Sequence, residues 1–307
     1  MNKNNIFSSL TLLGLFVFSS CNLDLAPEDT LSPKTYFKNG PQLELWTNHF
    51  YSLFPDVDDL AKQNADDNIS SELGETLMGQ RSAASENGWT WERLRDINYY
   101  LQHSNQCPDE HVRKQYDGVA YFFRAYFYFD KVKRYGDVPW YDQVLNSNDD
   151  KLLAKPRQDR EIIMDSVMQD LDKAIGMLPT KKDQVRVTKW TALALKSRVA
   201  LYEGTFRKYR GMNDAEKYLK QAVAAGEQFI DNSGYRLYTN GAEPYRTLFN
   251  SIDAVGDEII LAKRHSNTAN VRHSIPFNII IYRQSFTKRF MNHYLMADGT
   301  RFEDQAG

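Results

Sequence analysis

Cysteine is scarce in this chain, and positive charge is not in excess, with 38 Lys and Arg residues against 40 Asp and Glu residues. Its two cysteines are Cys21 and Cys107, and Cys21 directly follows an apolar N-terminal run that is typical of a targeting signal. Because a lipidated Cys21 would leave only Cys107, we expect no disulfide within the mature chain. The net charge is −2 at pH 7, which excludes the basic surface of a nucleic-acid-binding domain. The 307 residues must therefore fold by burying a hydrophobic core.

Sequence signatures of common catalytic and cofactor sites are also missing. The chain has no phosphate loop, no glycine-rich dinucleotide turn and no Gly-x-Ser-x-Gly elbow. Its six histidines form no close His-x-x-x-His pair, so we expect no metal ion and no cofactor. Several carboxylates cluster in a polar stretch, which favours a solvated loop over the acid–base pair of a glycosidase. These carboxylates are Asp58, Asp59, Asp66 and Asp67.

The N-terminus is typical of a bacterial lipoprotein. Lys3 precedes an apolar run over 6–18 that is too short to span a bilayer as a mature helix. Ser19 and Ser20 then stand directly before Cys21, as in a lipobox. Residues 1–20 are therefore predicted to be a signal peptide and Cys21 to carry a lipid anchor. The alternative is an ordinary secretory signal in which Cys21 is incidental. No later stretch is apolar enough to cross a membrane.

Apolar residues recur at helical spacing along most of the mature chain. The expected helices are 41–53, 91–103, 118–135, 163–178, 188–204 and 214–230. Short polar joints between amphipathic helices indicate antiparallel pairs of the tetratricopeptide kind. Two short apolar runs, 258–261 and 277–282, predict strands. The fold class is therefore mostly α, with a small irregular, β-containing C-terminal segment.

The stretch 118–140 is the most informative of these helices. Tyr121, Tyr128 and Phe129 belong to one aromatic stripe, and the charged residues, among them Arg124 and Lys131, are expected to lie largely elsewhere around the helix. The stripe consists of Tyr121, Phe122, Ala125, Tyr128, Phe129 and Val132. Gly136 is suited to the left-handed conformation that ends a helix, and Pro139 prevents its continuation.

This Arg-Ala-Tyr-aromatic helix followed by Gly-Asp-Val-Pro resembles the signature of the SusD/RagB family. The pair Arg95 and Asn98, the string 170–174 and the string 186–189 match further family segments in order. The resemblance implies an outer-membrane lipoprotein that faces the cell exterior. It also implies that the protein binds an oligosaccharide without cleaving it, for a SusC-like TonB-dependent transporter. The acidic residues after Cys21 resemble a surface-export signal of such proteins.

The resemblance divides the chain into four parts. Residues 1–20 form the signal peptide, 21–40 an extended tether, 41–263 the helical scaffold, and 264–307 the start of a mixed loop and strand region. Family members usually continue for about as long again, so we expect this chain to be the N-terminal portion or a truncated product.

Candidate ligand-binding residues lie in the loops. Trp89 precedes a helix within a polar stretch and joins no helical stripe, so it is a candidate platform for a sugar ring, or else it packs on the helix start. Trp91 falls on the apolar stripe of the expected helix 91–103 and is assigned to the core. Family members place binding residues in this early loop and in loops after the scaffold, which adds Asp67, Arg81 and Tyr282. Two other functions stay open: a helical-repeat scaffold that binds a protein partner, and a surface glycosidase.

Overall fold

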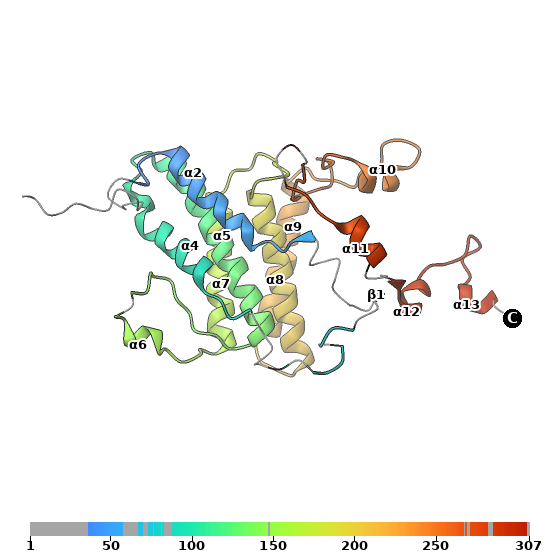
Figure 1. Cartoon of the computed structure of the whole chain (residues 1–307), viewed down its shortest axis with the longest axis horizontal. Coiled ribbons are helices and arrows are strands. Elements are labelled where there is room, and N and C mark those ends of the chain that lie inside the picture. Colours follow the sequence, from blue (N-terminus) through green and yellow to red (C-terminus); the bar gives the residue numbers. More distant parts are fainter. Residues whose placement is uncertain are drawn as a thin grey trace, which may run out of the picture.

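The computed structural model describes residues 36–57, 67–69, 73–75, 77–80, 82, 88–146, 148–266, 268, 271–281 and 285–305. Most of these residues are helical, as expected from the sequence (Figure 1). The longer elements are α2 (Gly40–Asn48), α4 (Glu92–His103), α5 (Glu110–Tyr135), α7 (Arg160–Met177), α8 (Lys189–Tyr209) and α9 (Ala215–Asn232). The shorter helices are η1 (His49–Leu53), η2 (Ser104–Gln106), α6 (Asp150–Leu153), α10 (Pro244–Asn250), α11 (Ile275–Ile281), α12 (Lys288–Met291) and α13 (Phe302–Gln305).

The four longest helices lie side by side in chain order, as Figure 1 shows. α5 packs on α7, α7 on α8 and α8 on α9, while α2 and α4 cover the outer side of α5. The contact between α8 and α9 is close, because a Cβ atom at Gly204 would lie only 2.8 Å from the side chain of Leu219. Ala222 and Ala225 on α9 are also buried. The predicted fold class of antiparallel helix pairs is therefore confirmed.

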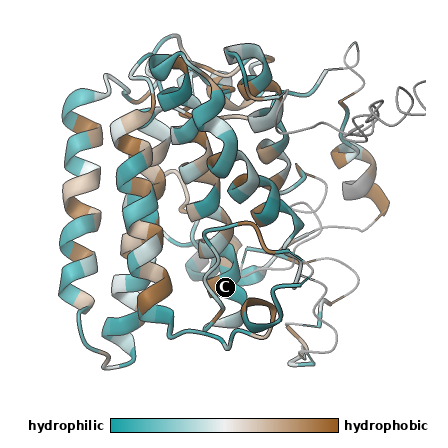
Figure 2. Cartoon of the chain, turned by 90° about the vertical axis from the view of Figure 1, so that its left-hand side faces the viewer, coloured by the Kyte–Doolittle hydropathy of each residue, from teal (hydrophilic) through white to brown (hydrophobic). Residues whose placement is uncertain are grey.

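The core is centred on α5. Phe123 and Tyr128 are completely buried, and Phe129 is 5% exposed and packs edge to face on Tyr202 of α8, with ring centroids 5.3 Å apart. Hydrophobic and hydrophilic residues alternate along the individual helices (Figure 2), as a bundle with one solvated face per helix requires. The aromatic stretch that stands out in the sequence is thus the centre of the packed interior.

Two charged residues of α5 were wrongly predicted to lie away from the core. Arg124 and Lys131 are each only 5% exposed. Arg124 donates through Nε and Nη2 to the carboxylate of Asp170 on α7, at 2.6 and 2.8 Å. Lys131 donates to the carbonyl of Gly88 and lies 4.9 Å from the ring centroid of Phe127. Because α2, α4 and α7 pack around α5, these two side chains are buried, and their partners satisfy them.

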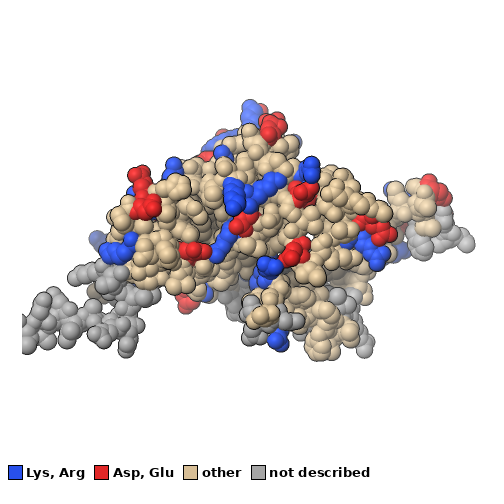
Figure 3. All heavy atoms as spheres, turned by 90° about the horizontal axis from the view of Figure 1, so that it is seen from above, with Lys and Arg blue, Asp and Glu red and all other residues tan. Residues whose placement is uncertain are grey.

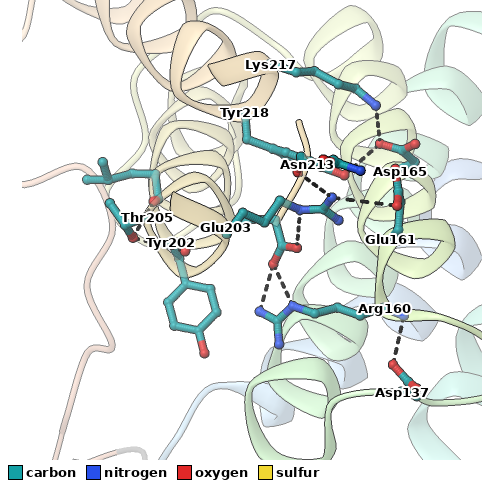
Figure 4. Close-up of polar contacts among 12 residues, drawn as sticks. Asp137, Arg160, Glu161, Asp165, Tyr202, Glu203, Thr205, Asn213, Lys217 and Tyr218 are labelled. Carbon is teal, nitrogen blue, oxygen red and sulfur yellow. Dashed lines mark hydrogen bonds and ion pairs between the residues drawn. The ribbon is translucent and has the colours of Figure 1, made fainter. Parts of the chain in front are cut away.

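A second buried ionic cluster joins α7 to α8 (Figure 4). The carboxylate of Glu203 is completely buried and accepts hydrogen bonds from Nε of Arg160 and Nε of Arg207, each at 2.8 Å. Nearby, Asp165 on α7 accepts from Lys217 at 2.8 Å and from Tyr218 at 2.7 Å, both on α9. Charged groups therefore connect three successive helices within the bundle.

The helix ends largely follow the sequence signals. Gly136 ends α5, as predicted, and has a positive φ of +71°, although its ψ of −113° lies outside the left-handed helical region. Thr188 caps α8 and forms a capping box with the first turn of the helix. Asp159 is the N-cap residue of α7, but its side chain makes no capping bond. Asp137 supplies that bond instead, accepting from the backbone N–H of Arg160 at 2.9 Å.

The two strand predictions were wrong. Residues 258–261 are irregular, and the backbone N–H of Ala262 donates to the carbonyl of Gln184 at 2.7 Å instead of joining a sheet. Residues 275–281 form α11, which has Pro276 in its first turn. Short apolar runs do not distinguish strand from helix. The strands of the described residues are β1 (Asn68–Ile69) and β2 (Ser285–Phe286), which pair antiparallel.

The surface of the bundle carries no broad field of one sign on the face seen from above. Basic and acidic side chains are interspersed there (Figure 3), in agreement with the net charge of −2. Of the helices in the described ranges, none combines the length and the apolar character that crossing a bilayer requires. A search of the same ranges finds no group of side chains suited to hold a metal ion.

Candidate functional site

A groove of about 640 Å³ lies between the N-terminal end of α4 and the long loop that joins α5 to α7. In Figure 1 this is the loop that carries α6. Apolar side chains form much of its lining, and polar side chains stand among them. The apolar lining residues are Trp89, Trp91, Leu94, Pro139, Tyr141, Leu145, Leu153 and Pro156. The polar lining residues are Glu92, Arg95, Asn98, Gln143, Lys155 and Arg157.

The loop is closed at its base by its own hydrogen bonds. The backbone N–H of Gln158 donates to the carbonyl of Val138 at 3.1 Å, and the Gln158 side chain accepts from the backbone N–H of Trp140 at 3.1 Å. Lys155 then donates to the carbonyl of Trp140 at 3.0 Å. The two ends of the loop are therefore held together, which fixes the position of the groove wall.

The helical core holds the same loop from below. Asn98 on α4 donates to the carbonyls of Tyr141 and Gln143, at 3.0 and 3.2 Å. The buried Arg124 donates to the Asn98 side-chain oxygen at 3.3 Å. Tyr128 accepts from the backbone N–H of Tyr141 at 2.6 Å. Burial raises the pKa of the Tyr128 hydroxyl, which keeps it neutral at physiological pH. A hydrogen-bonded network in the core thus orients the groove wall.

Trp89 stands at the edge of the groove and is 39% exposed. Its ring packs edge to face on Trp91 and Tyr135, with centroids 5.1 and 4.8 Å away. The guanidinium carbon of Arg157 lies 4.9 Å from the Trp89 ring centroid. Trp89 therefore packs on the start of α4 through Trp91, as the alternative interpretation expected, and it also lines the groove. Its role as a ligand platform stays a prediction.

Asp67, a second predicted site residue, does not line this groove. Asp67 is exposed, and its backbone carbonyl accepts from the N–H of Thr287 at 3.0 Å, beside the β1–β2 pair. Arg81, Tyr282 and the lipidation candidate Cys21 lie outside the described residues. Asp67 is thus placed away from the lining of the groove, and for the other three the sequence prediction stands alone.

Several residues of the groove were missed from the sequence. Trp91 was assigned to the core, yet it is only partly buried and contacts both the core and the groove. Arg95 was noted only as part of a family string, although it follows Trp91 by one helical turn. Lys155 and Arg157 belong to a connector of more than twenty residues with little regular structure. Such long connectors in compact domains are often functional, and this signal was available.

Comparison with known proteins places the chain in a family. Residues 46–201, just over half of the chain, match a SusD-like family model described as starch-binding and associated with the outer membrane. The matched range includes α4, α5, α7 and the groove loop. The chain belongs to the SusD/RagB family. The resemblance seen in the aromatic helix and its Gly-Asp-Val-Pro turn is therefore confirmed.

Relatives of this SusD/RagB member include both sequences and solved structures. A SusD-like protein of Formosa agariphila is 26% identical over 247 residues, which are 69% of this chain and 44% of the relative. A crystal structure of a SusD-like protein from Bacteroides fragilis is similar with a TM-score of 0.69 and 24% identity, covering 90% of this chain and 56% of that one. A laminarin-binding SusD-like protein gives a TM-score of 0.58 and 20% identity, over 76% and 52% of the two chains. The chain thus spans about half the length of the relatives it matches.

Proposed function

We propose that this SusD/RagB member binds an oligosaccharide in the groove between α4 and the α5–α7 loop. The observation that carries the proposal is Trp89, partly exposed at the edge of an apolar groove of about 640 Å³. An aromatic face takes the C–H groups of a sugar ring by dispersion, while polar side chains at the rim orient its hydroxyls. The match to a starch-binding family model and the similarity to a laminarin-binding protein support a carbohydrate as the ligand.

The groove supports binding without cleavage. Glycosidases need a carboxylic acid and a second carboxylate on either side of the scissile bond. Among the described residues that line the groove, Glu92 is the one carboxylate, and it is exposed. An exposed carboxylate without a partner does not provide the acid and the base or nucleophile that hydrolysis requires. We therefore propose a binding protein in preference to the glycosidase.

The proposed setting is the outer face of the outer membrane. Ser19-Ser20-Cys21 supports a lipid anchor at Cys21, and the family description supports an association with the outer membrane. The ligand would then pass to a SusC-like TonB-dependent transporter, on which this protein acts as a lid. Co-purification from detergent-solubilised outer membranes tests the partnership: a transporter of this class is expected with wild-type protein, and its absence would contradict this part of the proposal.

A helical-repeat scaffold that binds only a protein partner is the rival function. Retention on polysaccharide-containing native gels, followed by chromatography of the incubated glycan, separates the functions. Retention with no shortened product is expected. Shortened products would favour the glycosidase, and lack of retention by every neutral and anionic polysaccharide, with a transporter still co-purifying, would favour the scaffold.

A further inference from the structure

Positive charge exceeds negative charge in the lining of the groove. Arg95, Lys155 and Arg157 line it, and Glu92 is the one acidic residue among the lining side chains that the structure describes. Lys155 and Arg157 lie over aromatic rings, those of Tyr141 and Trp89, at 5.9 and 4.9 Å from the ring centroids. The net charge of the lining is thus positive, although the chain as a whole has a net charge of −2.

These three cations differ from surface cations that are paired with carboxylates. Arg134 is paired with Asp130 at 3.0 Å, and Lys217 with Asp165 at 2.8 Å. Within the described ranges, no carboxylate lies at ion-pair distance from Arg95, Lys155 or Arg157. Lys155 does donate to the carbonyl of Trp140 at 3.0 Å, but a neutral carbonyl leaves its charge uncompensated. The groove therefore retains positive charge available to a ligand.

Arg157 lies beside Trp89, the proposed platform for a sugar ring. Its guanidinium carbon is 4.9 Å from the centroid of the Trp89 ring, within the range of a cation–π contact. This contact restricts the side chain and leaves its N–H groups free to donate in the plane of the guanidinium. A planar guanidinium matches a carboxylate or a sulfate through two parallel hydrogen bonds, which a single sugar hydroxyl does not offer.

From this arrangement we propose that the groove selects anionic oligosaccharides, in which acid groups on the sugar rings pair with Arg157, Arg95 and Lys155. The aromatic side chains would hold the ring and the cations would read its charge. The inference rests on the proposed glycan-binding function and names the class of glycan. Uronic acid carboxylates and sulfate esters present the same chemistry to a guanidinium, so the test includes both.

The test compares polysaccharides that differ only in charge. The full chain is measured by affinity electrophoresis and calorimetry with polygalacturonate against its methyl-esterified form, and with a sulfated galactan against the same galactan after desulfation. The charged member of at least one pair is expected to bind about tenfold tighter in 0.1 M salt. That advantage should largely disappear in 1 M salt, where the Debye length falls from about 10 to about 3 Å. The pair that responds identifies carboxylate or sulfate as the acid group.

Matched variants assign the effect to the groove. Arg157→Gln should weaken binding of the charged member about fivefold, the upper end for an exposed ion pair, and leave the neutral member unaffected. Lys114→Gln removes the same charge from the first turns of α5, at the other end of that helix from Tyr135, and should change neither. Glu92→Gln should strengthen binding of the charged member.

The outcomes separate this inference from the function on which it rests. Equal binding of charged and neutral members through Trp89, or an Arg157→Gln variant that behaves like Lys114→Gln, would overturn the anionic selectivity and leave glycan binding intact. Failure of all four polysaccharides to bind would overturn the anionic selectivity. The glycan-binding function itself is overturned only if no other polysaccharide is retained on the native gels either. Circular dichroism of each variant confirms that these exposed substitutions leave the helices folded.

Discussion

The buried carboxylate of Glu203 offers a sharp test of how the helices are held together. Glu203 is completely buried, and its ionic partners Arg160 and Arg207 have side chains 9% and 1% exposed (Figure 4). The substitution Glu203→Ala leaves both guanidinium groups inside the bundle with no carboxylate between them. Removing one partner of a buried ionic cluster costs about 3–5 kcal/mol, which is a large part of the roughly 5–15 kcal/mol that stabilises a typical domain.

The assay is urea unfolding followed by far-UV circular dichroism, with Glu216→Ala as the matched control. Glu216 also pairs with a cation one helical turn away, Lys220 at 2.8 Å, but these two side chains are 79% and 75% exposed. We expect no measurable change for Glu216→Ala, because water already solvates both partners. If the two variants lose the same small amount of stability, the argument that burial makes the Glu203 cluster important is wrong.

Three further predictions concern the core, the pH dependence and the anchor. Phe129→Ala should lower the free energy of unfolding by about 3–5 kcal/mol, and a loss below about 1 kcal/mol would mean that the ring is not packed as described. Burial acts to raise the pKa of Asp165, but hydrogen bonds from Lys217 and Tyr218 outweigh it, so the pKa lies below its ordinary value of 3.8. The ionised carboxylate therefore stabilises the folded state above about pH 4, and this stabilisation is lost as the pH falls through the folded-state pKa. Between about pH 6 and 2.5 the urea midpoint should fall less in Asp165→Asn than in wild type. Identical pH profiles of the two proteins would refute this. Cys21→Ala should release the protein from the outer membrane, and mass spectrometry of wild type should find lipid on Cys21; a membrane-retained variant and an unmodified wild type would argue against the anchor.

The fold was predictable wherever local signals agree. The 3.6-residue periodicity of 118–135 and the cap at Thr188 identify helices that the structure contains. Burial of the charges on α5 was not predictable. Arg124 has its partner Asp170 46 residues further along the chain, and no periodic pattern on one helix reveals a partner on another. The strand assignment at 277–282 was wrong because its apolar residues also fit a short helix.

The site was predictable only in part for a related reason. Trp89 stood out because it belongs to no helical stripe, and the structure places it beside a groove. Arg157 did not stand out, because its contact with Trp89 exists only when the α5–α7 loop folds back on the N-terminal end of α4. Asn98 illustrates the same point, since its amide holds backbone carbonyls of that loop. A groove built from distant segments becomes visible only once the chain is folded.

The central claim is that a glycan binds in this groove on Trp89. Its most direct test is a calorimetric titration with a polysaccharide to which the wild-type protein binds. The titration compares wild type, Trp89→Ala and Tyr209→Ala. Trp89 lines the groove, whereas Tyr209 is an 81% exposed aromatic at the end of α8, outside it. Trp89→Ala removes the platform and should weaken binding about ten- to thirtyfold, equivalent to roughly 1.4–2 kcal/mol. Tyr209→Ala should bind as wild type does. Unchanged affinity in a folded Trp89→Ala variant would contradict the account and move the ligand away from this groove.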